Sequence, residues 1–299
     1  MVAILLALAS ALGYGGADFA AGLAAREASV IRVTIVAEVV SVLLMLLVVP
    51  WLSTGSPSAA SVGWAVAAGV GGIIGAMALY LGFRQAAFSV AAPLSAVASA
   101  AFSVLAGLLV GERPGDLALA GIALALPAIV AVSATPGSTP ASADSSAPAS
   151  GDRGRDARRR HLAGVMYGLV AGAGFGVLFI GLNRAGSGSD LWPALIAQVA
   201  GLAFVSLVGV ARGQFRLPAR RASWLAVLTG VIGAGGTLCF FVATHAGLLA
   251  VTAVITSLYP ASTILLARLL LGERITRIRI VGLALAGASV ALIAIPGTG

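Results

Sequence analysis

The stretch GLLAVTAVITSLYPASTILLARLLLGER at residues 247–274 has a counterpart, AAFSVAAPLSAVASAAFSVLAGLLVGER, at residues 86–113. Each is an apolar run of transmembrane length that ends in Gly-Glu-Arg. A shift of 161 residues, without a gap, lays residues 86–135 on residues 247–296, and fourteen of these fifty positions are identical. Shared apolar composition raises identity, but a Gly-Glu-Arg triplet at one fixed shift indicates that the two halves of the chain are a repeat.

The composition around these stretches is that of a membrane protein. Of the 299 residues, 60% are hydrophobic and 9% are charged, and the mean hydropathy is +1.06. A soluble domain carries roughly a quarter charged residues, so the charges of this chain cannot cover a soluble surface. The same values exclude a disordered chain, a disulfide scaffold and an ordinary soluble enzyme.

The chain contains ten apolar segments of transmembrane length. Each is close to the ~20 residues that a helix needs to cross ~30 Å of hydrocarbon. We therefore predict an all-α membrane protein with ten transmembrane helices. The segments are residues 2–25, 30–50, 61–83, 87–110, 115–134, 162–184, 190–211, 222–244, 248–271 and 276–295.

One long polar stretch divides these segments into two sets of five. Residues 135–161 are rich in Pro, Ser and Ala, lack an apolar period and end in an Arg-rich run, which is typical of a flexible linker. We predict a first five-helix repeat at 1–134 and a second at 162–299. Because five is odd, the second half must cross the membrane in the opposite sense. The halves are therefore predicted to be inverted repeats, as in many secondary transporters.

Arginine determines the predicted orientation. The chain has 18 basic and 10 acidic residues, and all the basic ones are Arg. Sixteen lie in the five odd-numbered loops or one turn inside them, against Arg113 and Arg184 on the other side. Cytoplasmic loops are enriched in Arg, so we expect these loops in the cytoplasm and both termini outside. Arginines spread between apolar segments favour an anionic membrane surface over nucleic acid as the partner.

Two acidic side chains lie well inside the predicted spans. Asp18 is seven residues before the end of the first span and Glu38 is eight after the start of the second. At ~1.5 Å per residue, both lie about 10–12 Å from the cytoplasmic end. An ionised acid at mid-membrane costs about 2.5–3.5 kcal/mol on insertion scales, and two adjacent carboxyls could share a proton. We predict a proton-coupling or cation-binding site; the alternative is bundle hydrogen bonding with Arg26 or Arg32 as counter-charges.

Other candidates are aromatic or polar residues within the spans. Tyr14 and Phe175 are repeat mates, each between two glycines, and could form a wall of a central cavity. Gln198 lies one residue from the repeat mate of Glu38. The alternative for the two aromatic residues is ordinary helix packing, and for Gln198 it is a structural interhelical hydrogen bond. The remaining candidates are Tyr80, Tyr259 and, for an anionic substrate, Arg268. The alternative for Arg268 is that its side chain snorkels to the membrane interface.

No enzyme or metal constellation is visible in the sequence. Without any lysine a Walker A motif is impossible, and His161 and His245 are not spaced as a metal cluster. Cys239 is the one cysteine and forms no intramolecular disulfide. We expect no catalytic residue, no metal and no cofactor. A membrane-embedded lipid-modifying enzyme and a non-transporting assembly partner are the alternatives to a transporter.

The chain resembles the EamA-type transporters of the drug/metabolite transporter superfamily. The resemblance rests on the fivefold repeat, the two Gly-Glu-Arg triplets, Ser257-Leu258-Tyr259-Pro260 and Gly13-Tyr14-Gly15 before Asp18. It covers all of the chain except the linker. It implies a ten-helix transporter of small metabolites or drugs, often an exporter. Family members are commonly drawn with both termini cytoplasmic, and the arginine count predicts the reverse here.

The expected surroundings follow from this resemblance and from the composition. We expect a multi-pass protein of the cell membrane, the inner or plasma membrane. Its partners would be a small-molecule substrate, the lipid bilayer and, through the buried acids, protons. We expect a monomer or a homodimer.

Overall fold

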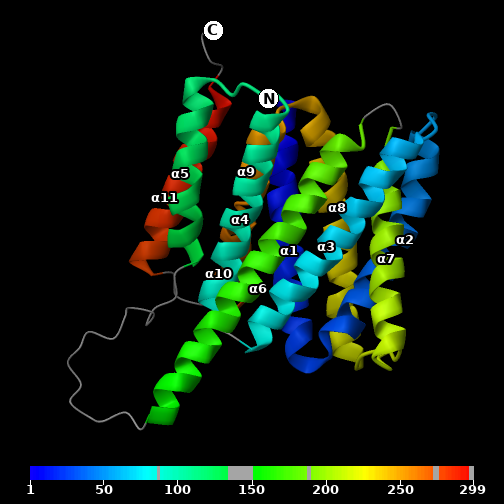
Figure 1. The fold of residues 1–299 in the computed structure, drawn as a ribbon, viewed down its shortest axis with the longest axis vertical. Coiled ribbons are helices and arrows are strands. Elements are labelled where there is room, and N and C mark those ends of the chain that lie inside the picture. Colours follow the sequence, from blue (N-terminus) through cyan, green and yellow to red (C-terminus); the bar gives the residue numbers. More distant parts are fainter. Residues whose placement is uncertain (86–87, 134–150, 187–189, 272–275, 296–299) are drawn as a thin grey trace.

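The computed structural model describes residues 1–85, 88–133, 151–186, 190–271 and 276–295. Within these ranges the chain forms helices and no strand. Figure 1 shows them as one bundle of roughly aligned helices. The helices are α1 (Val2–Glu27), α2 (Val30–Leu52), α3 (Ala59–Gln85), α4 (Phe88–Leu109), α5 (Asp116–Ser133), α6 (Gly151–Arg184), α7 (Trp192–Ala211), α8 (Arg220–Ala246), α9 (Leu249–Thr256), α10 (Tyr259–Leu271) and α11 (Arg277–Ala294).

The helices have the surface expected of a multi-pass membrane protein. Seven of those described are long and apolar enough to cross a membrane. Outward-facing leucines are widely exposed (Leu47 67%, Leu207 69%), whereas Ser95 and Thr256 are fully buried. Lipid favours this arrangement, because polar groups must find partners inside the bundle. The all-helical membrane fold is thus confirmed, and the count of ten spans stays a prediction. Three shorter apolar helical stretches cover the other predicted spans: Leu94–Leu109, Asp116–Ala131 and Leu249–Thr263.

The predicted ninth span is broken into two helices. α9 ends at Thr256, and Pro260 lies in the first turn of α10, where the missing N–H of a proline costs nothing. Two hydroxyl contacts hold the break against α4. The hydroxyls of Ser257 and Ser99 lie 3.2 Å apart, and the Tyr259 hydroxyl donates to Ser95 Oγ at 3.4 Å. The break is therefore a fixed feature of the packing.

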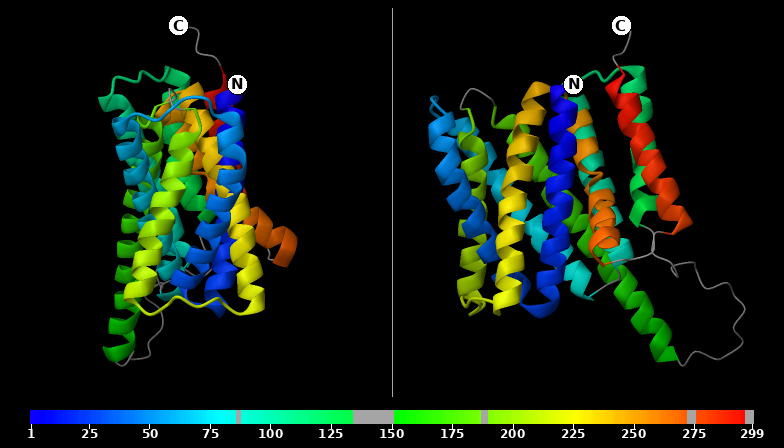
Figure 2. Two further views of the ribbon diagram at one scale, coloured as in Figure 1. Left: turned by 90° about the vertical axis from the view of Figure 1, so that its right-hand side faces the viewer. Right: turned by 180° about the vertical axis from the view of Figure 1, so that it is seen from behind.

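The ends of the bundle differ in what they carry. Figures 1 and 2 show both termini at one end and the start of α6 at the other. The turns between α1 and α2 and between α7 and α8 lie at the α6 end, where Arg221 pairs with Glu27 at 3.1 Å. The arginine-rich odd loops predicted from the sequence thus share one end in the described residues.

The Arg-rich part of the predicted linker is helical. α6 begins at Gly151, so residues 151–161 belong to the helix, which projects beyond the bundle at its lower end in Figure 1. Arg and Ala are strong helix formers, and the apolar span that follows extends the helix backwards. The linker predicted over 135–161 is corrected to this extent. Residues 134–150 lie outside the described residues, so a flexible segment there stays a prediction.

The largest helix–helix interfaces come in pairs: if each helix is replaced by its counterpart in the other half, one interface of a pair becomes the other. α1 packs against α8 as α6 packs against α3, and α2 packs against α8 as α7 packs against α3. α4 contacts α6, and its counterparts α9 and α10 contact α1. The edges of the bundle in Figure 1 are the self-related pairs α5–α11 and α2–α7. This is the pattern that a repeat predicts, although the inversion itself stays an inference.

A carboxylate joins the two halves at the end that carries the termini. Glu112, between α4 and α5, accepts the backbone N–H groups of Leu249 at 2.6 Å and Ala250 at 2.9 Å. These are the first residues of α9, where N–H groups lack helical partners and the helix dipole favours negative charge. The Gly-Glu-Arg triplet of the first half is thus a cap that bridges the halves. Its mate, Glu273-Arg274, lies outside the described residues.

We predict that Glu112→Gln lowers the free energy of unfolding by about 1 kcal/mol, the size of a lost helix cap. The amide has one acceptor oxygen, so only one of the two N–H groups keeps its partner. The thermal unfolding midpoint of the purified protein measures the effect. Asp116→Asn, which removes an exposed acid from the start of α5, is the control for the loss of a helix-dipole interaction alone. An unchanged midpoint in E112Q would show that the cap contributes nothing.

Asp190 makes a second contact between the halves at this end. It accepts the backbone N–H groups of Thr54 at 2.7 Å and Gly55 at 2.8 Å, in the α2–α3 connection. These two hydrogen bonds favour the carboxylate and lower the pKa of Asp190 below its usual range. Any stability that they add is therefore present above the ordinary Asp pKa and lost as pH falls through the lowered value.

Candidate functional site

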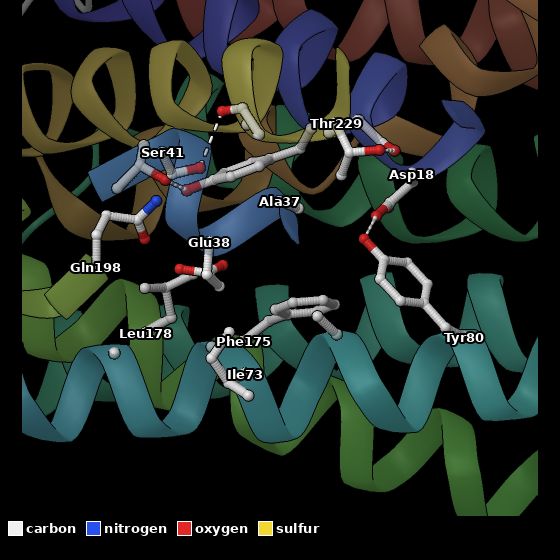
Figure 3. A pocket seen from close by; sticks show the side chains of 18 of the residues that line it. Asp18, Ala37, Glu38, Ser41, Ile73, Tyr80, Phe175, Leu178, Gln198 and Thr229 are labelled. Atoms are coloured by element: carbon white, nitrogen blue, oxygen red, sulfur yellow. Dashed lines mark hydrogen bonds between the residues drawn. The ribbon is translucent and has the colours of Figure 1, made fainter. Parts of the chain in front are cut away.

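A cavity of about 100 Å³ lies between the two halves of the chain. Its walls come from α1, α2 and α3 of the first half and from α6, α7, α8 and α10 of the second. Figure 3 shows the side chains that surround it. Seven of the eight predicted site residues line it: Tyr14, Asp18, Glu38, Tyr80, Phe175, Gln198 and Tyr259. The eighth, Arg268, has its side chain outside the described part of the structure.

Glycines bring α1 close enough to place Tyr14 in this cavity. A Cβ atom at Gly13 would lie 2.8 Å from Gly236 Cα of α8, and one at Gly15 would lie 2.5 Å from the Tyr259 carbonyl oxygen of α10. The two glycines thus face different neighbours, and the residue between them points inward. The same holds for the mate: Gly174 packs against α3 and Gly176 against α4, with Phe175 between them. Close packing and an aromatic cavity wall are therefore one feature.

Asp18 is held by a tyrosine from another helix. The side chain is 9% exposed, and the Tyr80 hydroxyl donates to its Oδ1 at 3.2 Å. Tyr80 lies on α3, so the contact fixes α1 against α3 at the cavity edge. Figure 3 shows this pair on one side of the cavity and Glu38 with Gln198 on the other.

Glu38 carries an unsatisfied acceptor. Its Oε2 is buried and has no hydrogen-bond partner among the described residues, and the side chain lines the cavity. The predicted sharing of a proton with Asp18 is not seen as a direct contact, since Asp18 bonds to Tyr80 instead. The predicted counter-charges are not seen either: neither acid forms an ion pair in the described part of the chain. A buried acceptor without a partner is costly, so Glu38 is the residue here that requires a functional reason.

Most hydroxyl groups around the cavity already donate a hydrogen bond to the protein. Five of the six that line it donate to fixed acceptors of the protein, and the sixth, Thr237, accepts the bond from Tyr14 at 3.2 Å. Among the described lining side chains, the donors left without a fixed acceptor are the Thr237 hydroxyl and the Gln198 amide, so acceptors outnumber free donors in the cavity. The other donations run from Ser41 to the Gly230 carbonyl, Tyr80 to Asp18, Thr229 to the Leu225 carbonyl and Tyr259 to Ser95.

Aromatic rings form the apolar part of the wall. Phe175 meets Tyr259 edge to face, with ring centroids 6.4 Å apart, and Tyr14 lies 6.2 Å from Phe179 in a tilted pair. The first pair joins α6 to α10, and the second joins α1 to α6. In the view of Figure 3 the Phe175 ring lies between Glu38 and the Asp18–Tyr80 pair. The two residues predicted to form an aromatic wall, Tyr14 and Phe175, thus line the same cavity as the acids.

The glycine-lined faces of α3 and α8 were not among the predicted parts of the site. Gly69, Gly72, Gly230 and Gly233 all line the cavity. A signal for them existed, because the run GVGGIIGA at 69–76 matches GVIGAGGT at 230–237 at the same 161-residue shift, with three glycines in common. Thr229, Ser41 and Leu178 also line the cavity, and no repeat marks them.

Comparison with known proteins supports a transporter fold. Residues 162–295 match the family model of the EamA-like transporter family. No curated protein matches the chain. A solved structure, described as a crystal structure of a protein, is 14% identical, covers 97% of this chain and 99% of its own length, and has a TM-score of 0.72. At that identity the similarity shows a shared fold alone.

Proposed function

We propose that this chain, whose residues 162–295 match the model of the EamA-like transporter family, is a secondary transporter that exports a small organic solute across the cell membrane. The family match agrees over residues 162–295 with the resemblance seen in the sequence, and with the apolar helices it supports a multi-pass membrane protein of the transporter class. The direction, the solute and the mechanism are our inference. The observation that carries them is the cavity between the two halves, because a site shared by both halves can be exposed to either side in turn.

Alternating access follows from how the halves meet around this cavity. Paired interfaces such as α1–α8 and α6–α3 can exchange roles if the halves are inverted repeats. The Glu112 cap and the Asp190 contact join the halves at the end that carries the termini. Opening of the cavity toward this end would have to break these contacts. The discontinuous α9–α10 pair at the cavity is the kind of element that lines transport sites.

We propose that Glu38 couples this movement to protons. Its buried Oε2 has no partner among the described residues, and the side chain lines the cavity between the halves. A carboxyl group in this position can hold a proton when the solute is absent and release it when the solute arrives. Asp18 is better suited to positioning, because Tyr80 already occupies one of its oxygens.

Reconstitution tests the proposed transport directly. Purified protein in liposomes should release small amines or neutral metabolites from a loaded mixture faster than protein-free liposomes, with mass spectrometry of the external medium as the readout. A covalent cross-link between Cys residues introduced at Glu112 and Leu249 should stop the release, and its reduction should restore it. If the cross-linked protein releases solute as fast as the reduced protein, the proposal of alternating access is wrong. If no solute is released at all, the proposal that the protein is a transporter is wrong.

The topology gives a separate prediction. The arginine count and the shared end of the two termini lead us to expect a C-terminal reporter outside the cell. A C-terminal alkaline phosphatase fusion should be active and a green fluorescent protein fusion dark. The control is a fusion after Gln214, in the α7–α8 connection, which should give the reverse pattern. A fluorescent C-terminal fusion would show that both termini are cytoplasmic.

A further inference from the structure

We propose that the solute is a small organic ammonium ion with a compact apolar group, bound between Glu38 and the Phe175 ring. This inference rests on the proposed transport function and adds the chemical class of the solute. It depends on three properties of the described cavity, namely its hydrogen-bonding character, its charge and its size.

The hydrogen-bonding character favours a ligand that brings its own donors. Five of the six lining hydroxyls already donate to the protein. Glu38 Oε2 is a buried acceptor without a described partner. An ammonium group has three donors and no acceptor, so it satisfies this oxygen and finds further acceptors in the lining hydroxyl oxygens and the Gln198 amide oxygen. A ligand made only of acceptors would leave Glu38 unsatisfied.

The charge of the cavity selects against anions. Two carboxyl groups, Asp18 and Glu38, are among the twenty described residues that line the cavity, and none of these twenty is an arginine or a histidine. An anionic solute would meet like charge without a counter-ion in a site of low dielectric, whereas a cation offsets the buried carboxylate. The predicted anion-attracting role of Arg268 stays a prediction, because its side chain lies outside the described part of the structure.

The walls and the volume define the rest of the solute. Phe175 and Tyr14 present aromatic rings near the acids, and a cation is attracted to a ring face. Leu178 and Ile73 complete an apolar surface. A cavity of about 150 Å³ holds a benzene molecule, so the space of about 100 Å³ here suits roughly four or five heavy atoms without rearrangement.

Three probes with the same branched four-carbon skeleton test the class: isobutylammonium, isobutanol and isobutyrate. Each is titrated into the purified full-length protein, with calorimetry for binding and the unfolding midpoint for stabilisation. We expect saturable binding and a raised midpoint for isobutylammonium alone. Equal binding of the alcohol, or tighter binding of the carboxylate, would overturn the inference without any variant being made.

Two variants locate the binding site. Glu38→Gln removes the charge and should weaken isobutylammonium binding at least about tenfold, the usual value of a hydrogen bond to a charged group. Phe175→Leu keeps an apolar wall without the ring and should weaken it about threefold. The control Asp116→Asn changes an exposed acid on α5 and should bind like the parent. Unchanged binding in both site variants would place the amine elsewhere.

The binding and transport results separate the two proposals. If isobutylammonium binds but is not moved across liposomes, the transport proposal fails and the ligand class stands. If liposomes move a neutral metabolite and no amine binds, the ligand class fails and the transport proposal stands.

Discussion

Glu38→Gln is expected to abolish uphill transport driven by a pH gradient. The substitution keeps the size of the side chain and most of its hydrogen bonding but removes the group that can release a proton. Because the same carboxylate is expected to hold the ammonium group, binding of the amine should fall at least about tenfold as well. Accumulation against a gradient, followed in liposomes with an imposed pH difference, should fall to the protein-free background. The parent protein should concentrate the solute under the same conditions.

The fold itself indicates that this variant will be stable. Glutamine has nearly the size of glutamate, and a glutamine, Gln198, already lines the same cavity from the second half. Asp116→Asn, outside the cavity, should transport like the parent. If E38Q loses the pH dependence but keeps amine binding, Glu38 carries only the proton and the ligand inference is wrong. If E38Q transports like the parent across a pH series, both roles are excluded.

The sequence predicted which residues line the cavity better than it predicted the contacts between them. Depth in the span selected Asp18 and Glu38, and the repeat selected Tyr14, Phe175 and Gln198; all five line the cavity. The contacts depend on helix rotation, which the nearly uniform apolar character of these helices does not encode. Asp18 was paired with Glu38 by depth, whereas the rotation of α1 and α3 brings Asp18 to Tyr80.

The relation between Glu38 and Gln198 shows the same limit. At the 161-residue shift these residues are out of step by one. In the structure, the residue before Gln198 and the residue before Glu38 each pack their carbonyl oxygen against a glycine of a neighbouring helix. Ala197 meets Gly69 through its carbonyl oxygen, and Ala37 meets Gly230 in the same way. The register of α2 and α7 is therefore set by backbone packing against the glycine faces, and in that register Gln198 is the counterpart of Glu38.

We expect Gly69→Ala and Gly230→Ala to be the most destabilising of the small substitutions near the cavity. A Cβ atom at Gly69 would overlap the Ala197 carbonyl oxygen and lie 2.8 Å from its carbon. At Gly230 it would overlap the Ala37 carbonyl oxygen and lie 2.9 Å from Val40 Cβ. Backbone cannot rotate away as a flexible side chain can, so the helices must separate. Overpacking of this kind costs about 1–3 kcal/mol, and the two variants should cost similar amounts.

Matched alanines in the same helices distinguish this clash from a general effect of replacing glycine. Gly63 on α3 and Gly235 on α8 have no atom within 4 Å of an added Cβ. G63A and G235A should therefore unfold at the parent temperature or slightly above it, since Ala is the better helix former by about 1 kcal/mol. G69A and G230A should unfold at lower temperature and should also weaken amine binding. G69A would push α7 away and displace Gln198, whereas G230A would push α2 away and displace Glu38. If G69A were as stable as G63A, the approach of α3 to α7 would be looser than described, and the register that places Gln198 opposite Glu38 would lose its physical basis.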